Sequence, residues 1–158
     1  MAGVPIFRTG IAPEWIDYNG HVRDAYYGLM VSYAIDALMQ RLGLDQDYRE
    51  RSGCTLYTLE MHIHYLREIK ADDTVAVNVR IIGADHKRIH AVFELCCEPQ
   101  TAPAATAEIM LLHVQQAQGV ASATFPPALS AAIAELQQAG ASLAAGGPGS
   151  RQMQLPRR

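Results

Sequence analysis

The segment from Ala25 to Leu42 constrains the fold of this chain more than any other. It combines helix-forming and aromatic residues, contains no proline and stops at Gly43, a pattern that predicts a long helix ending at a glycine. Its few small or polar residues fall four positions apart and form one narrow stripe: Gly28, Ser32, Asp36 and Gln40. Because apolar side chains cover the rest of its surface, the helix must be buried by other elements.

The residues after this helix supply elements that can bury it. The stretch from Thr55 to Arg67 alternates with the period of a β-strand. Its apolar face holds Tyr57, Leu59, Met61, Ile63 and Tyr65, and its polar face holds Thr58, Glu60, His62 and His64. The same period returns in residues 75–81, 89–95 and 105–111, and residues 4–9 predict a strand before the helix.

Turn-rich connections indicate how these strands pair. Residues 68–73, 83–88 and 98–103 are short enough for hairpins. We therefore expect the four strands to form an antiparallel meander that curls around the long helix. This is the layout of the hotdog fold, an α+β architecture in which an antiparallel sheet wraps around a central helix.

The length of the chain, 158 residues, is typical of one domain, and we expect a single hotdog domain over residues 1–140. A second helix, with a weaker pattern, is predicted to follow Pro126 and Pro127. Residues 141–158 are rich in glycine and alanine and end in basic residues, which predicts a flexible tail.

Charge and cysteine content argue against several classes of function. The formal net charge of -3 arises from 13 basic and 16 acidic residues without a long run of either sign, so we expect no nucleic-acid or membrane partner. Cys54, Cys96 and Cys97 lack the spacing of zinc ligands and are expected to be reduced thiols in a cytoplasmic protein. Neither a secretory signal nor a membrane span is predicted.

Residues 15–27, WIDYNGHVRDAYY, place the carboxylate of Asp17 among aromatic rings just before the long helix. An Asx-turn is the ordinary role of such an aspartate. Gly20, however, permits a ligand to approach the backbone, and the helix start, where Asp24 is a plausible N-cap, offers free N–H donors and positive potential. A carboxylate facing a carbonyl polarised in this way can attack it or activate water, which predicts an acyl-transfer site.

Residues 17–22, with Tyr27 ten residues after Asp17, resemble the signature of hotdog acyl-CoA thioesterases of the 4-hydroxybenzoyl-CoA type. The resemblance implies that Asp17 is catalytic, as nucleophile or as base for water, and that the backbone N–H of Asp24 polarises the thioester carbonyl. It also implies a homodimer or homotetramer with sites between subunits. Many members of the family have an aspartate where this chain has Trp15, which leaves substrate choice open.

Longer stretches, residues 13–27, 53–68 and 83–90, resemble a narrower branch of that family, the betainyl-CoA thioesterases. Members of this branch also form the C-terminal domain of some bacterial carnitine dehydrogenases. The resemblance implies hydrolysis of betainyl-CoA to glycine betaine and CoA in carnitine breakdown. Two alternatives are a thioesterase for an aromatic or short branched acyl-CoA, and a module that binds acyl-CoA without cleaving it.

A trimethylammonium group is best held by aromatic faces, with a carboxylate as countercharge. The substrate-binding candidates are Trp15, Tyr18, Asn19, Tyr26, Tyr27, Tyr57 and Glu60. Tyrosines in such positions also serve as core or interface residues with hydrated hydroxyl groups. Of the catalytic candidates, which are Asp17, Gly20, His21 and Asp24, the histidine is expected to orient the loop, because the aspartate already provides a base.

The phosphates of CoA require a small basic group, for which Arg67, Lys87 and Arg88 are the candidates, although such residues in turns are usually solvated. Glu60 shares a strand face with the pair His62 and His64, but no third ligand has a suitable spacing, so we expect no metal. The expected chemistry needs no metal or redox cofactor, and coenzyme A enters as part of the substrate.

Overall fold

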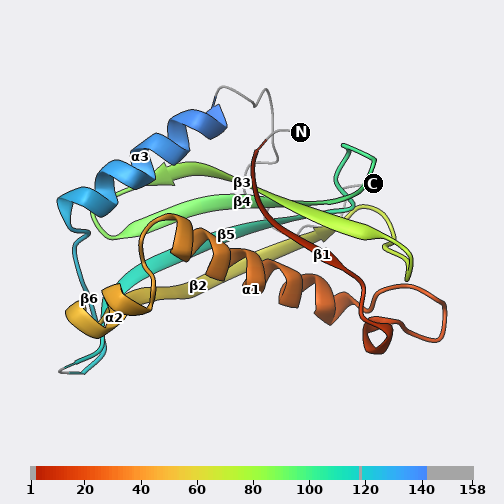
Figure 1. Cartoon of the computed structure of the whole chain (residues 1–158), viewed down its shortest axis with the longest axis horizontal. Helices are drawn as coiled ribbons and strands as arrows, with labels where there is room; N and C mark the ends of the chain where they lie inside the picture. Colours follow the sequence, from red (N-terminus) through yellow and green to blue (C-terminus); the bar gives the residue numbers. More distant parts are fainter. Residues whose placement is uncertain (1–2, 118, 142–158) are drawn as a thin grey trace, which may run out of the picture.

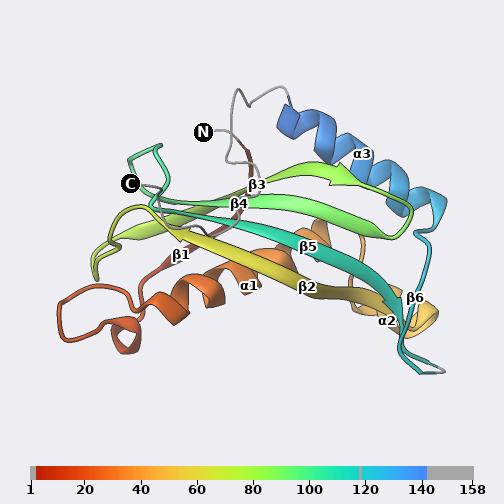
Figure 2. The same ribbon diagram turned by 180° about the vertical axis from the view of Figure 1, so that it is seen from behind.

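The computed structural model describes residues 3–117 and 119–141, which form an antiparallel sheet with the long helix α1 lying across one of its faces (Figures 1 and 2). The elements in chain order are β1 Val4–Gly10, the 3-10 helix η1 Pro13–Trp15, α1 Asp24–Arg41, α2 Gln46–Ser52, β2 Cys54–Tyr65, β3 Thr74–Ala84, β4 Arg88–Cys97, β5 Ala105–Gln115, β6 Ala121–Ser122 and α3 Pro127–Ala141. The predicted hotdog fold is confirmed.

The core lies between α1 and the inner face of the sheet. Met30, Val31, Ala34 and Leu38 of α1 are fully buried, as the apolar surface of this helix predicts. They belong to one cluster with the inward side chains of the strands, among them Phe93. The helix α3 lies against β3 and adds its own buried stripe to this cluster.

The strand order differs from the predicted four-strand meander. It is β1-β3-β4-β5-β2, so only β3, β4 and β5 form a meander and β2 pairs with β5 at the edge. Residues 66–73 cross the end of the sheet instead of forming a hairpin. The N–H of Leu66 donates to the carbonyl of Ala104 (2.8 Å), and the carbonyl of Ile69 accepts the N–H of Val22 (2.8 Å), which hold this crossing in place.

A bulge in β2 corrects the predicted apolar face of this strand. The register with β5 shifts at Leu59, which is 54% exposed. Before the bulge it is Leu56 that is buried, and Tyr57 points away from the core; after it, Met61 and Ile63 pack against the core. The alternation predicts the second half of the strand correctly and the first half wrongly.

Two short helices, α2 and η1, are absent from the sequence-based prediction. The helix α2 is polar and has no apolar period, but its ends are marked: Asp45 at the N-cap accepts the N–H of Tyr48 (2.8 Å), and Gly53 ends it with a φ of 66°. The N-cap of α1 is Arg23 and not Asp24, which is the first helical residue.

The predicted tail, residues 141–158, lies outside the described residues apart from Ala141, which ends α3. In the described part of the chain no helix is both long and apolar enough to cross a membrane. The three cysteines are free and buried. Burial raises the pKa of the Cys97 thiol to about 11, which suppresses its reactivity.

Candidate active site

The loop that carries Asp17 is a closed turn between β1 and α1. The N–H of Asp17 donates to the carbonyl of His21 (2.8 Å), and Ile16 forms a bridge with Val22. Gly20 has a φ of 81°, in the left-handed region that glycine adopts without strain. The sequence therefore builds a rigid support for the Asp17 side chain.

The crossing segment between β2 and β3 anchors this loop from outside. His21 forms a bridge with Lys70, next to the bond between Val22 and Ile69. The N–H of Ile69 also donates to the hydroxyl of Tyr27 (3.1 Å), and both residues are buried. Tyr27, predicted to bind substrate, therefore lies in the core and joins α1 to the crossing segment.

The carboxylate of Asp17 is held in one orientation. Its Oδ1 accepts the N–H groups of Asn19 (2.8 Å) and His21 (3.2 Å), and neither bond uses Oδ2. These donors, His21 first, hold the pKa of Asp17 below its ordinary value. The residue is thus an anion at neutral pH, with one oxygen fixed and the other facing no donor among the described residues.

Another aspartate shows that such a turn is not by itself a catalytic site. The Oδ1 of Asp85, in the β3–β4 turn, accepts the N–H groups of Lys87 (2.9 Å) and Arg88 (2.7 Å), and its pKa is lowered mainly by the first of these donors. The Asx-turn considered for Asp17 from the sequence is therefore present, and Asp85 forms a similar turn. Asp17 differs in its place beside the start of α1 and in its Oδ2, because the Oδ2 of Asp85 is paired with Arg88 (2.6 Å).

The start of α1 lies next to the Asp17 loop and offers one backbone donor. The N–H of Arg23 donates to the carbonyl of Trp15 (2.9 Å), which ties the helix start to the Asp17 loop. The next N–H groups are used locally, since Ala25 donates to the carboxylate of Asp24 (2.9 Å) and Tyr26 to the carbonyl of Arg23 (3.0 Å). The N–H of Asp24 has no partner among the described residues and lies at the positive end of the helix dipole.

The side chain of His21 pairs with an acid on the crossing segment. Its Nε2 lies 3.1 Å from the carboxylate of Glu68. This contact supports the predicted orienting role. Glu68 was missed from the sequence because a single glutamate in a turn carries no periodic signal.

The aromatic candidates divide into a packed pair and exposed rings. Trp15 and Tyr26 stack on each other, with ring centroids 5.6 Å apart at an angle of 17°, and both pack against the core. Tyr18 is 92% exposed. Tyr65, at the end of β2, is 53% exposed and its hydroxyl donates to the carbonyl of Asp24 (3.3 Å), so it is the accessible ring fixed at the start of α1.

Several predicted binding residues lie elsewhere in the subunit. Lys87 and Arg88 are in the β3–β4 turn, and β3 has 11 residues, so this turn is about 35 Å from the Asp17 end of the sheet (Figure 1). There Lys87 donates to Ser122 (3.2 Å) and Arg88 pairs with Asp85 (2.6 Å). Tyr57, near the start of β2, accepts a hydrogen bond from the Gln116 amide (2.7 Å).

Arg67 lies at the Asp17 end of the sheet, but its guanidinium donates to the side chain of Gln100 and the carbonyl of Ala102. It closes the connection between β4 and β5 against the end of β2. Of the three basic candidates for CoA, only Arg67 is therefore near Asp17 in the same subunit, and it is engaged.

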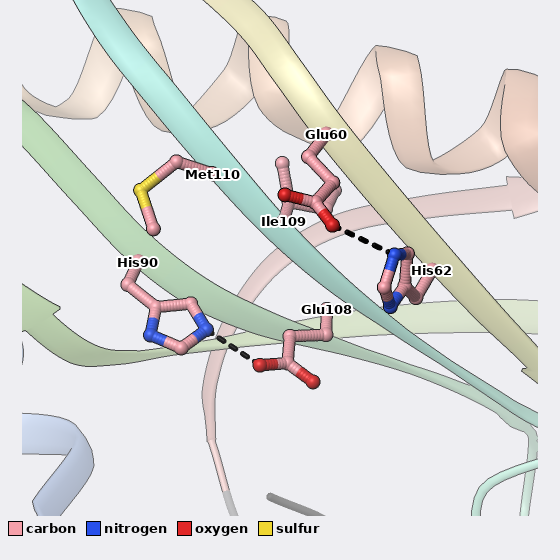
Figure 3. Close-up of a pocket in the computed structure, with 6 residues that line it drawn as sticks. All are labelled: Glu60, His62, His90, Glu108, Ile109 and Met110. Atoms are coloured by element: carbon pink, nitrogen blue, oxygen red, sulfur yellow. Dashed lines mark hydrogen bonds and ion pairs between the residues drawn. The ribbon is translucent and has the colours of Figure 1, made fainter. Parts of the chain in front are cut away.

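Glu60 lies on the outer face of the sheet, away from α1. It borders a cavity of about 270 Å³ with His62, His90, Glu108, Ile109 and Met110 (Figure 3). The imidazole of His62 is 2.9 Å from the Glu60 carboxylate, and that of His90 is 2.6 Å from Glu108. Among the described residues no group of three or more His, Cys, Asp or Glu side chains is arranged to hold a metal ion.

An anionic carboxylate and a helix N–H without a partner among the described residues lie at one end of this hotdog fold, and cleavage of a thioester requires groups of these two kinds. The chain belongs to the thioesterase-like superfamily, whose sequence profile matches residues 11–133.

Two relatives that match most of the chain have betainyl-CoA thioesterase in their names. The chain is 43% identical to the betainyl-CoA thioesterase of Pseudomonas aeruginosa over 84% of its own length and 83% of that protein. It is 40% identical, over 77% of its length, to the L-carnitine dehydrogenase/betainyl-CoA thioesterase of Agrobacterium fabrum, of which it spans only 25%.

Solved structures share the whole architecture. A protein of Pseudomonas putida KT2440 superposes with a TM-score of 0.86 at 39% identity, covering 99% of both chains. A Staphylococcus aureus protein solved in complex with CoA superposes with a TM-score of 0.84 at 28% identity, covering 99% of this chain and 98% of that one.

Proposed function

We propose that this protein hydrolyses acyl-CoA thioesters and that its substrate is betainyl-CoA, which yields glycine betaine and CoA. The observation that carries the proposal is the Asp17 carboxylate, with Oδ1 fixed, beside the start of α1; neither its Oδ2 nor the N–H of Asp24 has a partner within residues 3–117 and 119–141. The similarity to the betainyl-CoA thioesterase of P. aeruginosa supports the choice of acyl group. The pairing of that activity with carnitine dehydrogenase in the A. fabrum protein supports a place in carnitine breakdown.

In the proposed mechanism the thioester carbonyl oxygen accepts the N–H of Asp24, and the helix dipole stabilises the negative charge that develops there. Asp17 either attacks the carbonyl carbon through Oδ2 or removes a proton from an attacking water. The C–S bond then breaks and the CoA thiolate leaves and takes up a proton. In the covalent route water hydrolyses the acyl-aspartate. His21, held by Glu68, keeps the loop in position.

No metal or redox cofactor takes part in this mechanism, and CoA enters only as part of the substrate. The exposed ring of Tyr65 offers an aromatic face to a trimethylammonium group at the start of α1. We place the protein in the cytoplasm, since its three free thiols suit a reducing compartment.

We also propose that the functional unit is a homodimer, or a tetramer built from it, joined through β2. This strand has 12 residues and its outer edge has no partner strand in the described part of the chain. It carries the exposed apolar side chains of Leu59 and Tyr65 and is followed by exposed Leu66, and a long unpaired edge of this kind is a template for another strand. Antiparallel pairing of two β2 strands brings the partner's β3–β4 turn, with Lys87 and Arg88, to the Asp17 end of the combined sheet, within reach of CoA phosphates.

The proposal is tested by thiol release from betainyl-CoA, isobutyryl-CoA and 4-hydroxybenzoyl-CoA, with binding of each measured in parallel. We expect the highest kcat/KM with betainyl-CoA. A preference for one of the other two compounds would change the proposed substrate but not the proposed reaction. Tight binding of all three without thiol release would overturn the enzymatic proposal in favour of an acyl-CoA-binding module.

A further inference from the structure

The polar stripe of α1 follows the free edge of the sheet. A Cβ atom added to Gly28 would lie 3.7 Å from the Cδ1 of Ile63, near the end of β2. Further along the helix, Asp36 and Gln40 border a cavity together with Leu56, near the start of β2. The helix and the edge strand therefore run in opposite directions, with the stripe beside the edge.

The cavity at the far end of the stripe contains an unpaired carboxylate. It has a volume of about 450 Å³ and is lined by Asp36, Met39, Gln40, Arg49, Thr55 and Leu56. The guanidinium of Arg49 donates to the carbonyl of Leu44 (3.1 Å), and within the described residues Asp36 forms no ion pair. The Asp36 side chain is exposed, and Arg49 keeps its positive charge beside a neutral carbonyl, so the lining carries one charge of each sign. Of these lining groups, the Asp36 carboxylate is the one that can attract a cation.

Asp36 is too far from the catalytic loop of its own subunit to meet such a group there. It lies twelve residues beyond Asp24 on the same helix, a distance of about 18 Å. The cation of betainyl-CoA is separated from the reacting carbonyl by a single methylene group. A contact between Asp36 and the bound acyl group must therefore come from another subunit.

Edge-to-edge pairing of β2 provides this contact. In an antiparallel pair of identical strands the start of one lies opposite the end of the other. When the full strands Cys54–Tyr65 are aligned, the partner subunit's Leu56 lies opposite Ile63, and so beside Gly28 in the first turns of α1. Gly28 has no side chain to project from α1 beside Ile63.

We propose that the partner subunit's Asp36 supplies the countercharge for the cationic acyl group and so determines selectivity for betainyl-CoA. This inference rests on the proposed function and names the specificity residue of that same site. The site is then composite: Asp17, the α1 start and Tyr65 come from one subunit, and the Asp36 carboxylate comes from the other.

The first test compares betainyl-CoA with 3,3-dimethylbutanoyl-CoA, in which carbon replaces the nitrogen and the shape is kept. Asp36→Asn should raise KM for betainyl-CoA about tenfold, equivalent to about 1.4 kcal/mol, and leave KM for the neutral compound within about twofold. Asp47→Asn, which removes an exposed carboxylate from α2 outside the cavity, should change neither. An equal rise in KM for both substrates, or no change in KM for either, would overturn the role of Asp36.

The second test mixes Asp17→Asn subunits with Asp36→Asn subunits at a low concentration of betainyl-CoA. If the two residues act across the interface, a random mixture should recover about a quarter of wild-type activity, because half of the dimers are mixed and each of these holds one complete site. No recovery above the separate variants would show that they act within one subunit. If wild-type protein releases no thiol from betainyl-CoA, the proposed function itself is wrong; if it does and Asp36→Asn keeps its selectivity, only this inference is wrong.

Discussion

Replacing Tyr27 by phenylalanine tests how α1 and the crossing segment hold the active-site loop. The hydroxyl of Tyr27 accepts the N–H of Ile69 at 3.1 Å, and these residues are 4% and 0% exposed. The substitution keeps the ring and its T-shaped contact with Tyr65 but leaves a buried N–H without an acceptor. Water cannot easily replace the lost partner at a site this buried.

An unsatisfied buried backbone donor costs about 1–3 kcal/mol, which for a protein of this size corresponds to a fall in Tm of roughly 3–10 °C. Tyr65→Phe is the matched control, because it also removes one hydroxyl but from a side chain that is 53% exposed. Solvent replaces its bond to the Asp24 carbonyl, so we expect a loss of stability of less than about 0.5 kcal/mol. Because Tyr27 is buried, its variant should keep the KM of the wild type.

The assay is urea denaturation at one fixed protein concentration, followed by steady-state kinetics on the folded protein. Holding the concentration constant matters because dimerisation contributes to the measured stability. Equal stability of the Tyr27→Phe and Tyr65→Phe proteins would refute the structural role of this hydroxyl. A raised KM in Tyr27→Phe at unchanged stability would instead return Tyr27 to the substrate-binding group, as the sequence predicts.

Three further predictions concern the loop, its carboxylate and the exposed ring of Tyr65. Gly20→Ala should lower the free energy of unfolding by about 1–2 kcal/mol, through strain at a φ of 81°, and should also lower kcat. Gly43→Ala, at a φ of 79°, should show a similar loss of stability by thermal melting and an unchanged kcat. Backbone donors lower the pKa of Asp17 from 3.8, so its anionic form persists as the pH falls. A pH profile of kcat/KM should therefore decline only below that value. A decline centred near pH 6 would implicate another group. Tyr65→Leu should raise KM for betainyl-CoA about 2- to 30-fold and spare the neutral 3,3-dimethylbutanoyl-CoA, while Trp15→Leu, which breaks a packed pair, should affect both substrates alike.

The long helix and the hotdog architecture were predictable because their signals are local. An 18-residue segment that is apolar nearly all round has to be buried, and residues 75–81, 89–95 and 105–111 keep the period of a strand. The position of β2 was not predictable in this way. Alternation shows that a strand has a buried face, but it does not show which strand is its neighbour, and hydrogen bonds from Leu66 and Val22 turn the expected hairpin into a crossing.

The candidate site shows the same difference between residues that are close in sequence and residues that are distant. Asp17, Gly20, His21 and the start of α1 are close in sequence, and the structure brings them together in one loop. Residues chosen for their chemistry alone were harder to place. The bulge at Leu59 leaves Tyr57 pointing away from the core, and the length of β3 separates Lys87 from Asp17 within a subunit.

The acidic partner of His21 and the cavity beside Asp36 depend on contacts between segments that are distant in sequence. Glu68 reaches His21 only because residues 66–73 cross the end of the sheet. Asp36 was recognisable as part of a polar stripe, but its cavity is formed only where α2 and β2 close against the helix. Neither arrangement leaves a pattern that a single sequence displays.

The most direct measurement is kcat for betainyl-CoA in Asp17→Asn, set beside Asp85→Asn. Both substitutions keep an oxygen that can accept the two N–H bonds of the turn, and both remove an anionic carboxylate of lowered pKa. If the carboxylate at the start of α1 performs the chemistry, Asp17→Asn should lose at least about 100-fold in kcat while Asp85→Asn stays close to wild type. Similar activity in the two variants would contradict the assignment of Asp17 as the catalytic residue.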